Sequence, residues 1–368
     1  MFIYLLSIII LFVISYTSYN PKTEKKLFVV LAIFLCFGYM CGSDWRVYES
    51  EYYSHFSHRA VEPGYMLVSN FLSNSGVDFW VFHTSVKVLC WCSFIYAFKK
   101  EWPNRNLGLP MMLFIASFGL FLFVNCPFRN LISISIFLLF VPCLEKKKYL
   151  LYVLGVLLAS SFHLSAFCFI VLPLINVNKF SSKILALFYF LILGVLLLKL
   201  DQVLINYILS PFPFLASKIM SYEDSELVQG SVISIGLILR LICLWGMLYF
   251  RTKLYEEGKQ FMFGLCYIYL ILSLFSYSMP ILFRVPLFLS PFFVLMESEI
   301  VYHFLNKRTR TVLRLFYLMV ALTITIKTVA SVYFVPYTNV IPYWIKGKSP
   351  SYMQRSDYNF EHSPYREK

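Results

Sequence analysis

The sequence predicts an all-α protein that crosses a membrane many times, and three observations indicate this class. Hydrophobic residues make up 59% of the chain and charged residues only 14%, whereas soluble domains are about 45–50% apolar and about 25% charged. The mean hydropathy is +0.70. Apolar runs of about 17 to 25 residues, the length that spans a bilayer as a helix, recur along the chain. This composition excludes a soluble globular protein.

The first three apolar runs cover residues 2–16, 27–41 and 79–98. The next apolar stretch, residues 109–144, would form a helix about 54 Å long, which is too long for one crossing of a core about 30 Å thick. Residues 125–130 interrupt it with Asn125, Pro127 and Asn130, so we expect two spans joined by a tight turn. The later runs cover residues 184–200, 232–250, 261–279, 281–296 and 312–333.

The stretch 149–175 is long for one span and short for two, and the distribution of positive charge decides between them. If the chain turns back at His163, most loop Lys and Arg residues fall on one side, as the positive-inside rule requires. The opposite loops then hold only Arg46, Arg59, Arg129, Lys218 and Arg284. We therefore expect about twelve spans. Both termini, the loops 42–78 and 201–231, and the polar tail 335–368 are then extracytoplasmic, and the whole chain is one polytopic domain.

The segment 42–65 reads GSDWRVYESEYYSHFSHRAVEPGY and is dense in charged and aromatic residues. In so apolar a chain, this loop predicts a site for a polar ligand at the membrane surface. Two structural alternatives stay open. Asp44 would cap a short amphipathic helix that carries Trp45 and Tyr48, and Glu62 with the following Pro and Gly is also a turn signal.

Seven ionisable side chains converge on the external face in this topology: Asp44, Arg46, Glu62, Arg129, His163, Arg240 and Arg284. Ionisable residues inside a membrane are costly and usually functional. The alternatives are snorkelling for Arg129 and a hydrogen-bonded core histidine for His163. Arg284 lies between two prolines, where a broken helix frees backbone donors for an anion. Lys87 and Lys327 are left unassigned.

Several function classes are excluded or disfavoured. The net charge of +13 does not indicate nucleic-acid binding, because the basic residues lie mostly in short loops that orient a membrane protein. The nine cysteines form no CxxC pair and predict neither a disulfide framework nor a metal site. His55 and His58 have helical ligand spacing but no third ligand nearby. No nucleotide, zinc-protease or hydrolase motif is present, so we expect no metal and no cofactor.

The order of five motifs resembles the EpsG-like family of Wzy-type bacterial polysaccharide polymerases. GSDWRVY at 42–48 and EPGY at 62–65 resemble the family's opening, and FRNLI at 128–132 its Arg-led helix start. LASSFHLSA at 158–166 is similar to the family's F-H-x-S-A segment, and FRVP at 283–286 to a late Arg-bearing span. The chain departs from the family pattern in one feature. Family members often carry an Arg shortly before the first motif, and residues 37–41 of this chain contain none.

The resemblance implies an enzyme of the bacterial inner membrane, with its active site facing the periplasm or exterior. Such an enzyme joins undecaprenyl-pyrophosphate-linked repeat units into O-antigen, capsule or exopolysaccharide. Its partners would be the lipid-linked donor and acceptor, membrane lipids and, as a further candidate, a chain-length regulator.

We assign roles by chemistry. A bidentate Arg suits pyrophosphate, and a base must accept the acceptor's proton. The pyrophosphate candidates are Arg129, Arg240 and Arg284. The base candidates are Asp44, which we prefer, Glu62 and His163. The sugar-binding candidates are Trp45, Arg46, Tyr48 and Tyr65. The alternative functions are a transporter or flippase of lipid-linked saccharides and a membrane O-acyltransferase acting on the same glycans.

Overall fold

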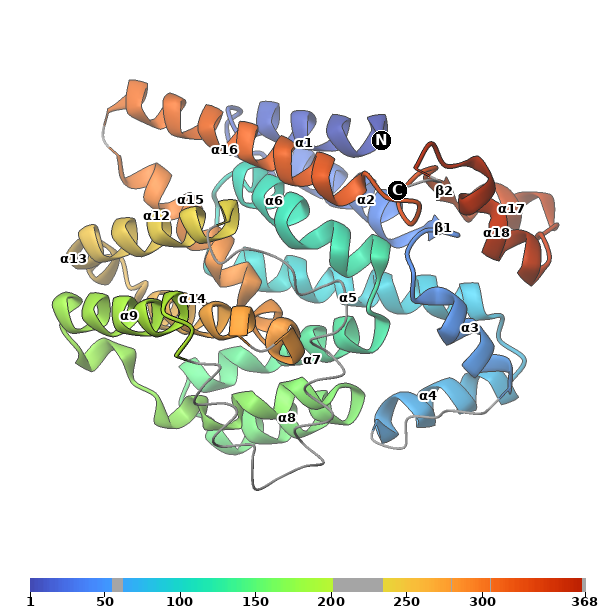
Figure 1. Ribbon diagram of the computed structural model, residues 1–368, viewed down its shortest axis with the longest axis horizontal. Coiled ribbons are helices and arrows are strands. Elements are labelled where there is room, and N and C mark those ends of the chain that lie inside the picture. Colours follow the sequence, from blue (N-terminus) through green and yellow to red (C-terminus); the bar gives the residue numbers. More distant parts are fainter. Residues whose placement is uncertain (55–61, 201–233, 279, 305, 366–368) are drawn as a thin grey trace. The chain divides into compact units, whose positions relative to one another are not determined.

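The computed structural model describes residues 1–54, 62–200, 234–278, 280–304 and 306–365. The predicted loop 201–231 and the pair His55 and His58 lie outside the described residues. The chain divides into two compact units, whose helices and strands are labelled in Figure 1. Unit 1 comprises Met1–Ile170 and Arg308–Lys368, and unit 2 comprises Val171–Lys307. Each unit is described by itself.

The described chain is almost entirely helical, which confirms the predicted class. Among the described residues, six helices are long and apolar enough to cross a membrane: Phe79–Glu101, Gly108–Asn125, Phe128–Glu145, Gln260–Tyr277, Leu282–His303 and Lys307–Val329. Shorter apolar helices cover Phe2–Ile14, Tyr149–Phe162, Leu164–Lys179, Ser182–Leu197 and Ile235–Tyr249. In lipid, helices satisfy every backbone polar group within the segment, which is why so apolar a chain takes this form.

Unit 1 contains most of the predicted loop residues on short helices between the long ones. Its helices are α1 (Phe2–Ile14), α2 (Pro21–Cys36), α3 (Trp45–Ser54), α4 (Pro63–Asn74), α5 (Phe79–Glu101), α6 (Gly108–Phe114), α7 (Phe128–Glu145), α8 (Tyr149–Phe162), α16 (Lys307–Val329), α17 (Ile341–Lys346) and α18 (Tyr352–His362). The strands β1 (Gly38–Tyr39) and β2 (Thr338–Asn339) pair antiparallel.

The long apolar stretch 109–144 forms two helical segments, as predicted. Helix α6 continues into the π-helix η1 (Ile115–Asn125). Cys126 then adopts a left-handed backbone conformation with φ of 56°, and α7 begins at Phe128. Long π-helical stretches are rare and often mark functional sites. Here the π-helix ends at Asn125, which contacts the first loop.

The stretch 149–175 turns back at His163, and this prediction is also confirmed. Helix α8 ends at Phe162, and the 3₁₀ helix η2 (Leu164–Leu174) follows. The Tyr152 hydroxyl donates a hydrogen bond of 2.8 Å to the carbonyl oxygen of Phe169. In one continuous helix these two residues would be about 25 Å apart, so the contact requires a hairpin.

The two ends of unit 1 differ in charge. At one end lie α3, the turn at Asn125, His163 and the segments near Met1 and Tyr365; the Tyr4 hydroxyl donates to the carbonyl of Phe334. At the other end the basic loops meet, where Lys99 pairs with Glu24 at 2.8 Å and Lys100 contacts Glu145. The C-terminal tail therefore lies on the same face as the first loop.

Unit 2 is a second helical bundle with one basic end. Its elements are η3 (Val177–Lys179), α9 (Ser182–Leu197), α12 (Ile235–Tyr249), α13 (Arg251–Glu256), α14 (Gln260–Ser278), η5 (Pro280–Arg284), η6 (Pro286–Leu289) and α15 (Ser290–His303). At the basic end Arg251 donates to the carbonyl of Asn178 at 3.1 Å. Arg240 lies toward the opposite end, where its guanidinium meets Tyr277 near the end of α14.

Candidate functional site

The centre of the candidate site in unit 1 is Arg129, in the first turn of α7. Its side chain is only 2% exposed. Nη1 donates a hydrogen bond of 2.7 Å to Oε2 of Glu62, and Nη2 lies 3.6 Å from Oε2 of Glu51. A buried guanidinium requires paired carboxylates or other acceptors to offset its lost hydration. Arg129 is therefore a bridge between the helices α3, α4 and α7.

Two tyrosine rings complete the surroundings of this guanidinium. Its carbon lies 5.1 Å from the ring centroid of Tyr48 and 5.3 Å from that of Tyr65, distances at which a cation is attracted to an aromatic face. Both rings are buried. In this conformation the two rings contact Arg129, each other and Phe128, and their faces are not open to a sugar.

The EPG motif packs directly against the turn that precedes His163, and Gly64 makes this approach possible. A Cβ atom on Gly64 would lie 2.3 Å from Oγ of Ser161 and 3.1 Å from the ring of Phe162, closer than real Cβ contacts. Only glycine lets α4 come this close to α8. Glu62, two residues earlier at the start of α4, is thereby directed toward both Arg129 and His163.

His163 connects the hairpin to Glu62. Its Nδ1 accepts a hydrogen bond from the backbone N–H of Ser165 at 3.3 Å, so in the neutral ring the proton is on Nε2. That Nε2 lies 4.0 Å from Oε1 of Glu62, a spacing that one water could bridge. The imidazole thus caps the start of η2 and presents an N–H toward the carboxylate.

Asp44 occupies a separate place at the start of α3. Gly42 has a φ of 88°, and a Cβ there would lie 2.6 Å from the carbonyl oxygens of Val124 and Asn125. The backbone N–H of Ser43 donates to Oδ1 of Asn125 at 3.0 Å, and the Ser43 hydroxyl donates to Oδ1 of Asp44 at 2.7 Å. Within the described part of the chain, Asp44 makes no ion pair.

The helix predicted to follow Asp44 is present as α3, and the carbonyl of Asp44 accepts the first helical hydrogen bond, from Tyr48, at 3.2 Å. Trp45 is 1% exposed. Arg46 donates from Nη2 to the carbonyl of Ser356 at 2.8 Å, so it contacts the C-terminal tail. Trp45 is therefore buried, and the half-buried Arg46 is engaged by the tail.

The other two predicted phosphate ligands belong to unit 2. Arg240 lies in the second turn of α12, and its Nη1 donates to the hydroxyl of Tyr277 at 2.6 Å; Tyr269 is a second hydroxyl partner. No carboxylate pairs with Arg240 among the residues that the structure describes. Arg284 ends η5, which follows α14 directly. Both arginines therefore lie toward the same end of α14, as expected.

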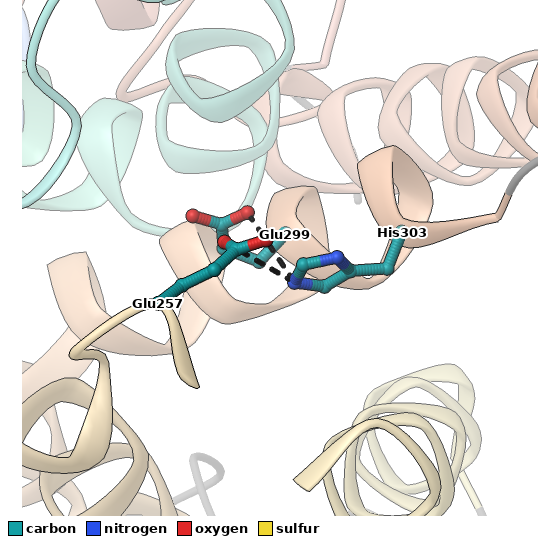
Figure 2. Close-up of side chains that lie close together, drawn as sticks. All are labelled: Glu257, Glu299 and His303. Atoms are coloured by element: carbon teal, nitrogen blue, oxygen red, sulfur yellow. Dashed lines mark ion pairs between the residues drawn. The ribbon is translucent and has the colours of Figure 1, made fainter. Parts of the chain in front are cut away.

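A group of possible metal ligands lies at the basic end of unit 2 (Figure 2). Ligand atoms of Glu257, Glu299 and His303 lie within 4.8 Å of one another. His303 Nε2 is 3.8 Å from Glu257 and 3.9 Å from Glu299. However, the ammonium of Lys259 contacts Glu299 directly and supplies a positive charge there. We interpret the group as an ion-pair network that joins the α13–α14 turn to α15.

Sequence reasoning missed two participants, Glu51 and Asn125. Glu51 is the second carboxylate at Arg129; its position three residues after Tyr48 puts both on one helix face, a signal that was available. Asn125, which holds the first loop, was recognised only as a turn residue. Lys87, left unassigned from the sequence, is 1% exposed on α5 beside His83 and Thr84.

The fold and this site together define a multi-pass membrane protein with a charged, aromatic-lined cluster at one end of its helices. The chain belongs to the EpsG family, which it matches over residues 25–344. This match confirms the family resemblance of the sequence motifs. No curated protein and no solved structure matches the chain. Membership in the EpsG family supports a polysaccharide-polymerase type of function in general terms.

Proposed function

We propose that this protein is a Wzy-type polymerase of the bacterial cytoplasmic membrane. It joins oligosaccharide repeat units carried on undecaprenyl pyrophosphate by glycosyl transfer at the extracytoplasmic face. The observation that carries the proposal is that the EPG glutamate Glu62, the helix-start Arg129 and the hairpin residue His163, which come from three separate family-like motifs, form one cluster. This cluster lies at the end of unit 1 opposite its basic loops, which is the external end by the positive-inside rule.

The reaction requires a base and a stabilised leaving group. The acceptor hydroxyl oxygen forms a bond to the anomeric carbon of the donor as the bond from that carbon to the pyrophosphate oxygen breaks. The hydroxyl proton passes to a carboxylate, and the negative charge that develops on the pyrophosphate is stabilised by arginine. Every atom and charge is then assigned to a protein group or a substrate.

Asp44 is the better base and Glu62 the better positioning group. Glu62 forms an ion pair of 2.7 Å with the buried Arg129, and protonation of this carboxylate would remove the negative charge that offsets the buried guanidinium. His163 presents an N–H toward Glu62, so in this tautomer it donates rather than accepts a proton. Among the described residues, Asp44 has only the Ser43 hydroxyl as a hydrogen-bond partner, which leaves its second oxygen for the acceptor.

Arg240 is the preferred pyrophosphate ligand. Arg129 is sealed between two carboxylates, whereas in the described chain Arg240 has only tyrosine hydroxyls. A cation on a membrane helix without a countercharge favours an anionic ligand. Its planar fork matches phosphate oxygens, which a lysine ammonium does not. Arg284 would add a second cation at the same end of unit 2.

The experiment is a reconstituted assay with a lipid-pyrophosphate repeat unit as both donor and acceptor. The product is a ladder of glycans of increasing length. We expect Asp44→Asn to lower the initial rate by about 10²–10⁴-fold, and Arg240→Lys to leave mostly single repeat units. Glu361→Gln, which changes an exposed carboxylate on α18, is the matched control. Saccharide that crosses the bilayer without any new glycosidic bond would contradict the proposal and favour a transporter.

A further inference from the structure

The polar C-terminal segment folds back onto the first loop in unit 1. Strand β2 pairs with β1, with Asn339 opposite Gly38 and Thr338 opposite Tyr39. Helices α17 and α18 follow, and α18 packs beside α3 (Figure 1). Because β1 leads directly into the loop that carries Asp44 and α3, the tail contacts this loop both before and after Asp44.

A buried ion pair joins α18 to α3. Arg355 donates from Nη2 to Oε1 of Glu49, and their side chains are only 11% and 4% exposed. Arg355 also donates to the carbonyl of Pro350. Burial raises the pKa of the Glu49 carboxyl, and the Arg355 guanidinium opposes this shift. Without Arg355, an ionised Glu49 would be left buried and unpaired.

A second contact fixes the start of α3. Nε of Arg46 donates to the Ser356 hydroxyl at 3.1 Å, and Nη2 donates to the Ser356 carbonyl at 2.8 Å. The guanidinium lies over the rings of Trp45, at 4.8 Å, and Phe360, at 5.4 Å. Trp45, Arg46 and Glu49 lie within about 100° of one another around the helix axis, so the contacts with the tail fall on one side of α3.

A different side of α3 carries the contacts to Arg129. Tyr48 lies under the guanidinium of Arg129 at 5.1 Å, and Glu51 lies 3.6 Å from its Nη2. Helix α3 has ten residues, which is too short to be stable alone in water. The position of α3, and therefore the positions of Tyr48 and Glu51, depends on the contacts that α3 makes with α18.

We propose that α18 is a positioning element of the site: Arg355 and Ser356 hold α3 where Glu51 and Tyr48 meet Arg129. Arg355 itself contacts none of the proposed reacting groups. The inference concerns the geometry of the site, and its link to catalysis rests on the proposed polymerase function.

The first test is a double-mutant cycle on thermal unfolding of the full-length protein in lipid nanodiscs. Glu51→Gln lowers the Tm in an otherwise unchanged protein because Arg129 loses one carboxylate. In the Arg355→Gln background the same change should shift the Tm by less than half as much, because Glu51 has already moved away. In the Glu361→Gln background the shift should keep its full size. Equal shifts in all three backgrounds would overturn the inference.

The second test is hydrogen–deuterium exchange over residues 45–54. Arg355→Gln should raise the exchange rate of α3 at neutral pH by about tenfold or more. The defect should shrink in mildly acidic buffer, because the raised pKa of Glu49 rises further without Arg355 and protonation then removes the unpaired charge. The double variant Glu49→Gln with Arg355→Gln should exchange nearly as slowly as the unchanged protein. Unchanged exchange in Arg355→Gln would show that α18 does not hold α3.

Whether α18 affects catalysis is tested separately, by steady-state kinetics. With the lipid-linked donor, Arg355→Gln should lower kcat more than it raises KM, because α18 acts on the reacting geometry. Faster exchange of α3 with unchanged kinetics would reject the positioning role while leaving the polymerase proposal intact. If the unchanged protein forms no glycosidic bond, the polymerase proposal fails, and the double-mutant cycle still decides whether α18 positions Glu51.

Discussion

Replacement of Arg129 by Met tests the central contact of the site. This change removes the cation between Glu62, at 2.7 Å, and Glu51, at 3.6 Å. Removing one partner of a buried ion pair costs about 3–5 kcal/mol. The carboxylates are 13% and 11% exposed, so some solvation remains and we expect the lower end, about 3 kcal/mol. That corresponds to a roughly 100-fold change in the folding equilibrium.

Two further variants sharpen the prediction. Arg129→Lys keeps the charge but reaches only one carboxylate, so we expect a loss of about 1–2 kcal/mol. Combining Arg129→Met with Glu62→Gln removes both charges of the closer pair. The combined loss should therefore fall short of the sum of the single losses by about 0.5–3 kcal/mol.

The assay is denaturant or thermal unfolding in nanodiscs, followed by tryptophan fluorescence. Lys25→Met is the control, because Lys25 is an exposed cation near the start of α2, at the basic end of unit 1, and its loss should change stability by no more than about 0.5 kcal/mol. If Arg129→Met is as stable as this control, or if its effect adds fully to that of Glu62→Gln, then the two carboxylates do not hold Arg129 and the proposed bridge between α3, α4 and α7 is incorrect.

Two other predictions follow from the packing and the topology. Gly64→Ala places a Cβ 2.3 Å from the Ser161 hydroxyl and should cost about 1–3 kcal/mol; Ser161→Ala should restore part of this loss. Gly194→Ala in helix α9 has nothing within 4 Å, and in the same unfolding measurement it should not destabilise the protein, because Ala is the better helix former. For the topology, a membrane-impermeant thiol reagent should label a cysteine at position 54 but not one at position 147 in intact cells, since Ser54 and Lys147 lie at opposite ends of unit 1. Labelling at position 147 from outside would reverse the orientation.

Much of the fold was predictable because the bilayer restricts the chain to few solutions. Runs of apolar residues must become helices there, and Asn125 and Pro127 interrupt the apolar stretch 109–144. The hairpin at His163 was also predictable. Only if the chain turns back there do most Lys and Arg residues of the loops fall on one side of the membrane. The division into two compact units was not visible, because helix–helix contacts in membranes depend on packing detail rather than on hydrophobicity.

The site was predictable only in part. The sequence placed Glu62, Arg129 and His163 at one membrane face but not in contact. Glu62 and Arg129 are 67 positions apart, and their pairing depends on the rotation of two helices and on Gly64. The aromatic residues expected to stack on sugars, Tyr48 and Tyr65, instead contact Arg129, because a buried cation attracts nearby ring faces.

The sequence by itself determined the class of the protein, its broken helices and which loops are basic. The length of an apolar run and the net charge of a loop are local properties of the chain. Only the tertiary structure decided which charges neutralise each other. The tail shows the difference most clearly: the sequence predicts the side of the membrane on which residues 335–368 lie but not the segment that they contact, and Arg355 lies buried against Glu49. This ion pair forms only when α18 packs against α3, so neither segment specifies it alone.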